Sequence, residues 1–142
     1  HIINIHQKIA MPEVSHIPHE GRDPWSQRYH MTSRQDEFDI TDEQLRRARH
    51  AYFAMTSYFD KLVGDLLDVL KTTNQMDNTY VFVISDHGDM IGERGMWFKF
   101  NPFEGSMPMI GMGPRLLYRH VEPALTTLAD LLPTFVDIAT DS

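Results

Sequence analysis

Cysteine is absent from this sequence of 142 residues, and its absence excludes several kinds of chemistry at once. Disulfide bonds, thiolate metal sites and a cysteine nucleophile cannot form within these residues. Long apolar runs are also missing, because no stretch approaches the roughly 18 residues that a transmembrane helix needs. We therefore expect no membrane among the partners of this chain.

Positive charge is scarce as well. The 13 lysines and arginines stand against 20 acidic residues, which gives a formal net charge of −7. A chain this acidic is not expected to bind nucleic acid as its main partner. Residues 1–6 lack the basic start and long apolar core of a signal peptide, which favours a cytoplasmic location. The first residue is His1 rather than methionine, so we expect this chain to be a piece of a longer protein.

The clearest secondary-structure signal is a long helix over residues 41–73. Thr41 and Gln44 form a capping-box pattern at its start, and apolar residues then recur at helical spacing. Before it, residues 1–40 show little periodicity and are interpreted as a connecting segment with one short helix near 25–29. Charged side chains off the apolar pattern, and the histidines of the connecting segment, are expected to be solvated: Arg46, Arg47, Arg49, His6, His16, His19 and His30.

Beyond the long helix, residues 79–85 are an apolar run without alternation. Such a run is typical of a strand covered on both faces in a parallel sheet. Residues 100–142 carry weaker signals: a loop, a short strand over 108–112 and a helical pattern over 125–139. Pro133 lies inside that last pattern and predicts a break or a new helix start. The predicted fold class is α/β, with too few strands for a complete sheet.

The unit 79–99 consists of the strand and the most informative loop of the sequence. Asp86 and His87 follow the strand directly, and ligands bind outside the carboxyl ends of strands in open α/β sheets. Asp86 offers an anionic oxygen and His87 an imidazole, so the pair could serve a metal ion. Lys99 adds a fixed cation, and the three groups together predict chemistry on a phosphate- or sulfate-like group. Simple hydrogen bonding at a strand end is the alternative interpretation.

The segment 84–106, ISDHGDMIGERGMWFKFNPFEGS, resembles the C-terminal part of the sulfatase catalytic domain, within the alkaline phosphatase superfamily. In its detailed residue sequence, this segment is most similar to the choline-sulfatases. The resemblance extends upstream through DPWSQR at 23–28 and through the helical segment 38–70. It implies that residues 1–142 are an incomplete part of one catalytic domain. The implied fold is an alkaline-phosphatase-like sandwich with a mostly parallel central sheet flanked by helices.

The resemblance also implies roles for the loop residues. In the family the aspartate and histidine of this motif help to hold a divalent cation, usually calcium, which gives Asp86 and His87 as metal residues. Magnesium and manganese are alternatives, and calcium's preference for oxygen makes His87 the more peripheral partner. The matching lysine, Lys99, contacts the sulfate, and with His87 it forms the catalytic set. A cation and an ammonium fixed in advance would stabilise the charge that develops as the S–O bond breaks.

The function implied is hydrolysis of sulfuric esters, with choline-O-sulfate the expected small-molecule substrate of a homo-oligomeric parent protein. The family's nucleophile is a formylglycine made in a C/S-x-P-x-R motif, which does not occur here, so we expect it in a missing N-terminal half. A phosphodiester or phosphonate monoester hydrolase on the same metal scaffold is one alternative. Another is that the 142-residue chain by itself is catalytically inert.

Overall fold

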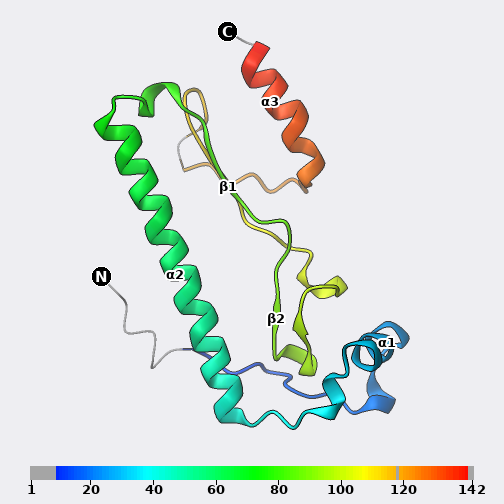
Figure 1. The fold of residues 1–142 in the computed structure, drawn as a ribbon. Coiled ribbons are helices and arrows are strands. Elements are labelled where there is room, and N and C mark those ends of the chain that lie inside the picture. The colour runs from blue at the N-terminus through cyan, green and yellow to red at the C-terminus, as the bar shows by residue number, and fades with distance from the viewer. Residues whose placement is uncertain (1–8, 118, 141–142) are drawn as a thin grey trace.

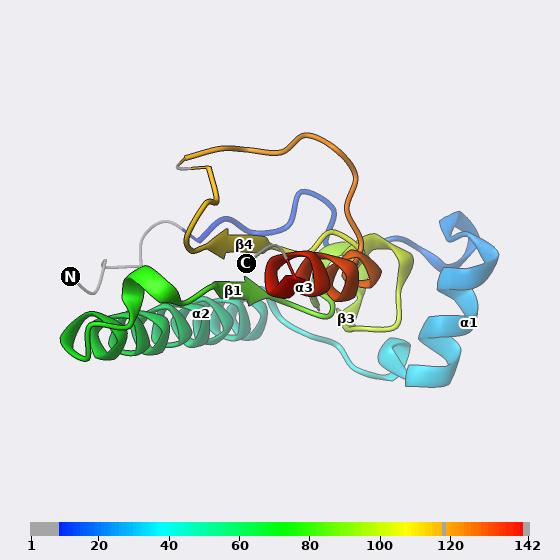
Figure 2. The ribbon, with the colours of Figure 1, turned by 90° about the horizontal axis from the view of Figure 1, so that it is seen from above.

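The computed structural model describes residues 9–117 and 119–140. Figure 1 shows α2 running along one side, β1 through the middle, and α1 beside β2 at the end away from α3. Figure 2 shows the chain between β4 and α3 looping out on the side away from α2. The helices and strands are α1 (Pro24–Ser33), α2 (Asp42–Thr72), β1 (Val81–Ile84), β2 (Met90–Ile91), β3 (Trp97–Phe98), β4 (Met109–Met112) and α3 (Leu131–Thr140).

Helix α2 begins where the capping-box pattern predicted a helix start. The Thr41 backbone N–H donates to the Gln44 side-chain oxygen at 2.9 Å, and the Gln44 N–H donates to the Thr41 hydroxyl at 3.3 Å. These two bonds satisfy backbone donors that the first turn of a helix leaves free. Of the apolar pattern along this helix, Leu45 alone is buried. Farther along, Phe59 and Leu66 are more than half exposed, so the described residues leave most of this face uncovered.

Both strand pairs in the described part of the chain are antiparallel. β1 pairs with β4 over its whole length, with Val81 opposite Met112 and Ile84 opposite Met109. β2 pairs with β3 through Ile91 opposite Trp97. The apolar run of β1 predicted a parallel neighbour, and this prediction is wrong for the described pairs. A parallel neighbour needs a crossover connection, usually a helix, whereas the chain between β1 and β4 forms a short hairpin and turns.

Two helices depart from their predicted bounds. α1 is longer than the helix predicted near 25–29, because the Asp23 carboxylate caps it and accepts the N–H groups of Trp25 and Ser26, each at 3.0 Å. α3 begins at Leu131, directly after a 3-10 turn at Leu128–Asp130, and continues through Pro133. Of the two predicted outcomes at Pro133, the break is wrong, and the new helix starts two residues earlier than predicted. Proline is tolerated in the first turn, since its missing N–H has no helical acceptor at that position.

The buried core is small and lies where α1, the start of α2 and the β2–β3 hairpin meet. It contains three apolar and three polar residues that are at least 93% buried: Leu45, Met90, Met96, Arg22, Ser26 and His30. The expectation that His30 is solvated is wrong, because its exposed fraction is 2%. No helix in the described ranges is long and apolar enough to cross a membrane.

Candidate functional site

Asp86 and His87 lie in the turn that leaves the carboxyl end of β1. The Asp86 side chain accepts the His87 backbone N–H at 3.0 Å, which is the local hydrogen bonding that the alternative interpretation predicted. The side chains are nevertheless open to solvent, with exposed fractions of 79% for Asp86 and 34% for His87. Both groups are therefore accessible to an ion or a substrate from outside.

The imidazole of His87 is held in one tautomer. Its Nδ1 lies 2.9 Å from the Gly88 carbonyl oxygen, which can only accept, so Nδ1 carries the hydrogen. In the neutral ring, Nε2 then keeps its lone pair, and this atom lies 3.4 Å from Asp86 Oδ2. A histidine whose other nitrogen donates to a backbone carbonyl is the usual arrangement of a metal ligand. The turn thus presents a nitrogen and an oxygen donor side by side.

Gly88 lies in this turn and contacts the segment that follows β3. Its N–H donates to the Glu104 carbonyl oxygen at 3.3 Å, so the segment after β3 closes over the turn. A Cβ at Gly88 would meet the free end of the Glu104 side chain, which can move aside. The Asp86–His87 turn is therefore packed against Glu104.

The surroundings of the turn are acidic. The Tyr52 hydroxyl on α2 donates to Asp89 Oδ2 at 3.3 Å, and burial together with the Asp89 charge raises the pKa of Tyr52. Burial, with the charges of Glu93 and Asp89 adding to it, raises the pKa of Glu104. The local field therefore favours a bound cation.

The loop charges pair across elements rather than with one another. The Arg49 guanidinium donates to the Ile91 carbonyl at 2.9 Å and forms an ion pair with Glu93. Arg49 is 11% exposed, so the expectation that it is solvated is wrong. The Arg94 guanidinium lies 4.5 Å from the centroid of the Phe103 ring. These contacts fix the β2–β3 hairpin to α2 and to the segment that follows Lys99.

Lys99 lies just beyond β3 in an unusual stretch of backbone. Both flanking residues have positive φ, 64° at Phe98 and 71° at Phe100, in the left-handed region that non-glycine residues rarely adopt. Such conformations cluster at functional sites, where the surrounding structure holds them. The ammonium lies 5.3 Å from the centroid of the Phe100 ring, and no hydrogen bond or ion pair joins it to Asp86 or His87. The structure brings Asp86 and His87 together and leaves Lys99 as a separate exposed cation.

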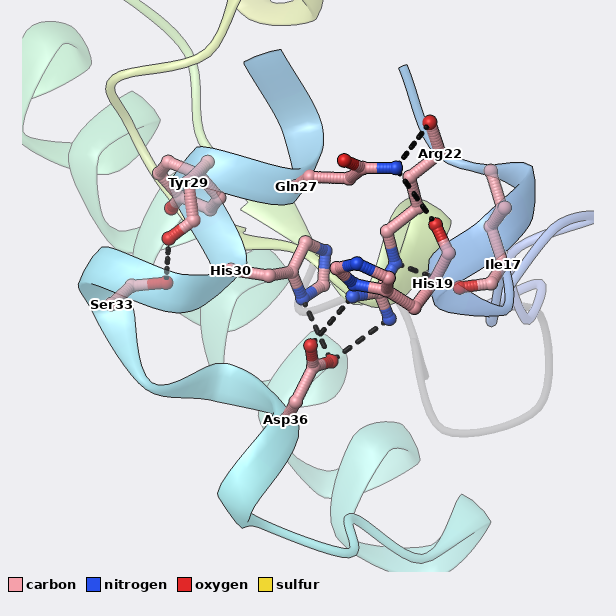
Figure 3. A network of polar contacts seen from close by, with 8 residues as sticks. All are labelled: Ile17, His19, Arg22, Gln27, Tyr29, His30, Ser33 and Asp36. Atoms are coloured by element: carbon pink, nitrogen blue, oxygen red, sulfur yellow. Dashed lines mark hydrogen bonds and ion pairs between the residues drawn. The ribbon is translucent and has the colours of Figure 1, made fainter. Parts of the chain in front are cut away.

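Sequence reasoning missed a buried polar cluster that joins α1 to the short helical turn at Gln35–Glu37 (Figure 3). Arg22, 3% exposed in its side chain, donates to both carboxylate oxygens of Asp36 at 2.6 and 2.8 Å. Its Nε also donates to the Ile17 carbonyl at 2.8 Å. His30 Nδ1 donates to the same carboxylate at 3.1 Å. The spacing of Arg22 and Asp36 carries no motif, so no sequence signal identifies this cluster.

Asp36 and His30, the two titratable partners of this cluster, both have a lowered pKa. Hydrogen bonds from Arg22, more than its charge, lower the pKa of Asp36, so this carboxylate stays ionised. Burial and the nearby Arg22 charge lower the pKa of His30, so the ring is neutral at pH 7. Because Nδ1 donates to Asp36, Nε2 of His30 is left without a hydrogen, and within the described residues it has no hydrogen-bond partner. These polar contacts hold α1 against the helical turn at Gln35–Glu37.

A metal ion needs more donors than the turn at Asp86 and His87 supplies. Among residues 9–117 and 119–140, no three histidine, aspartate or glutamate side chains gather closely enough to hold a metal ion. Asp86 and His87 by themselves provide one oxygen and one nitrogen donor in this turn.

The sequence of this chain matches known proteins over most of its length. The model of the sulfatase family matches residues 9–142, which is nearly the whole chain. The chain belongs to the sulfatase family. It is 47% identical over 131 residues to a choline-sulfatase of Rhizobium meliloti, an alignment that covers 90% of the chain and 25% of that protein.

Other sulfatases are similar over a shorter stretch. An arylsulfatase K of Xenopus laevis is 35% identical over 102 residues, covering 70% of the chain and 19% of that relative. An arylsulfatase K of Gallus gallus is 31% identical over 103 residues, covering 71% and 19%. The chain therefore spans a quarter or less of the length of these relatives. An α/β fold is consistent with its mixed helices and strands, while the sandwich with a parallel central sheet goes beyond what two antiparallel strand pairs show.

Proposed function

We propose that this chain supplies part of the active site of an enzyme that hydrolyses sulfate esters, with choline-O-sulfate as its substrate. The observation that carries the proposal is the turn after β1. Its tautomer leaves His87 Nε2 with a lone pair 3.4 Å from Asp86 Oδ2, open to solvent and in acidic surroundings. Membership of the sulfatase family and the 47% identity to a choline-sulfatase support the choice of substrate class.

In this proposal Asp86 and His87 hold a divalent cation, for which calcium is the first candidate and magnesium or manganese the alternatives. When bound, the cation supplies positive charge that draws electrons from the sulfate oxygens. Asp86 is the stronger partner for calcium, because a carboxylate oxygen suits this ion better than an imidazole nitrogen. The Gly88 carbonyl, by accepting from Nδ1, keeps His87 oriented toward Asp86. Residues outside this chain complete the cation's coordination.

Lys99 acts on the sulfate group from a second position. Its ammonium is exposed and unpaired with Asp86 and His87, so it is available to an anionic ester. A positive charge held there neutralises the non-bridging oxygens and stabilises the charge that builds up as the S–O bond breaks. The nucleophile, a formylglycine in this family, lies outside the 142 residues. We therefore expect the isolated chain to have no turnover and the full-length protein to have it.

The test is sulfate release from choline-O-sulfate by the full-length protein, with metal content measured on the same samples. We expect Asp86→Asn to lower both metal content and kcat/KM, the latter by roughly a hundredfold or more, because several kcal/mol of charge stabilisation are lost. Asp60→Asn, an exposed carboxylate on α2, is the matched control and should change neither. Unchanged turnover and metal content in Asp86→Asn would contradict the assignment.

The alternative within the same superfamily is hydrolysis of a phosphodiester or phosphonate monoester. The wild-type protein separates the two when a sulfate ester and a phosphonate monoester are compared under the same conditions. A higher kcat/KM for the phosphonate would replace the proposed substrate class while leaving the roles of Asp86 and Lys99 to be tested as before.

A further inference from the structure

The backbone that carries Lys99 is held by a tyrosine from α1. The Tyr29 hydroxyl donates to the Trp97 carbonyl oxygen and lies 3.2 Å from the Lys99 carbonyl oxygen. The Gln35 side-chain amide donates to the same Trp97 carbonyl at 3.4 Å and to the Tyr29 oxygen at 3.3 Å. Two side chains from one region of the sequence thus grip the two carbonyls on either side of Phe98.

The hydrogen bonds from Tyr29 and Gln35 reach a segment whose backbone is strained. Phe98 and Phe100, which flank Lys99, both have positive φ, and residues in this region persist where neighbouring groups over-determine them. The Lys99 side chain itself is exposed and rests over the Phe100 ring. The hydrogen bonds of Tyr29 and Gln35 to the Trp97 carbonyl, together with the bond from the Asn101 amide to the Phe98 carbonyl at 3.2 Å, therefore hold the backbone before Lys99.

Tyr29 is in turn held rigidly. Its ring stacks on Trp25 with centroids 5.2 Å apart, and its edge meets His30 at 6.1 Å. His30 and Arg22 both bond Asp36, which lies next to Gln35 in the chain (Figure 3). The buried cluster thus joins the helix that carries Tyr29 to the turn that carries Gln35, and these two residues approach the Lys99 loop together.

We propose that Tyr29 is a positioning residue for sulfate ester hydrolysis, fixing the backbone of Lys99 so that its ammonium stands where the sulfate group binds. This inference rests on the proposed function, because it assigns the effect of Tyr29 to the role of Lys99. The hydroxyl group makes the contact with the Trp97 carbonyl, and Tyr29→Phe removes this group while keeping the ring. Misplacement of a binding group by a fraction of an ångström is enough to lower turnover.

The experiment is a double-mutant cycle in the full-length protein, measured as kcat/KM for a sulfate ester. We expect Tyr29→Phe to lose roughly 5- to 30-fold, as for one hydrogen bond that orients a charged group. In a Lys99→Ala background the same change should cost nothing further, because residues that act as a unit are not additive. Tyr58→Phe, an exposed tyrosine on α2, is the matched control and should behave as wild type.

A second measurement separates this inference from the proposed function. Amide hydrogen exchange over residues 96–100 should become faster in Tyr29→Phe and stay unchanged in Tyr58→Phe. Faster exchange with unchanged turnover in both Tyr29→Phe and Lys99→Ala would refute the role of Lys99 itself. A loss in Lys99→Ala with none in Tyr29→Phe, or losses that add, would overturn the positioning role alone. If Tyr29→Phe does not fold, Gln35→Ala, which removes the second donor to Trp97, replaces it in the cycle.

Discussion

Breaking the ion pair between Arg22, which is buried, and Asp36 should destabilise the protein more than breaking a bidentate ion pair in which both partners are exposed. The chain offers both pairs within 16 residues. Arg22 bonds both carboxylate oxygens of Asp36 and is 3% exposed. Arg34 bonds both carboxylate oxygens of Glu37 at 2.6 and 2.7 Å, and these side chains are 72% and 52% exposed. Arg22→Met and Arg34→Met therefore compare a buried arginine with an exposed one, and Arg22→Met also removes the hydrogen bond to the Ile17 carbonyl.

The expected loss for Arg22→Met follows from its contacts. Removing one partner of a fully buried pair costs about 3–5 kcal/mol, because the other charge is left without compensation. Asp36, the charge left without its partner, is 48% exposed, so solvent compensates much of the loss and the expected cost falls to about 1–3 kcal/mol. That is a large share of the roughly 5–15 kcal/mol that stabilises a typical domain. For Arg34→Met we expect no measurable change, because an exposed pair is screened by solvent.

Urea unfolding followed by tryptophan fluorescence measures both variants. The two tryptophans report on the relevant region, since Trp25 lies in α1 and Trp97 in β3. Equal losses in the two variants, or a loss in Arg22→Met below about 1 kcal/mol, would refute the reasoning that burial makes this pair important.

Two further predictions concern pH and glycine. Burial lowers the pKa of His30 below its ordinary 6.5, so the unfolded chain binds a proton more readily and stability should fall as pH drops below about 6.5, by at most about 1.4 kcal/mol per pH unit. Urea midpoints at pH 7.5 and 5.5 test this prediction. His30→Gln should reduce the difference between the two midpoints, whereas His19→Gln, at an exposed histidine, should not. An unchanged difference in His30→Gln would exclude His30 as the cause. Gly92→Ala should cost about 1–3 kcal/mol, because its φ of 90° strains any residue with a Cβ, which would also meet the buried Leu45 side chain. Gly64→Ala, in open space on α2, should instead stabilise by about 0.5–1 kcal/mol, and thermal unfolding that ranks the two alike would contradict this account.

The long helix and the site turn were predictable because their signals are local. A capping box at Thr41 and apolar residues at helical spacing depend on neighbours a few positions away, and α2 lies where they placed it. The Asp86–His87 pair was found from its place after an apolar run, and the structure puts both side chains in one turn. Its role and that of Lys99 stay predictions, because no group of three ligands for a metal ion gathers among the described residues.

Sequence alone therefore determined the helix, the strand and the family, since each is written in short-range pattern and motif. Tertiary structure decided that β1 pairs antiparallel with β4, that Arg22 and His30 are buried on Asp36, and that Tyr29 reaches the loop of Lys99. These contacts join residues up to 70 positions apart. The charge, size and periodicity of a residue do not reveal which distant partner the folded chain brings to it, so no local pattern could have predicted them.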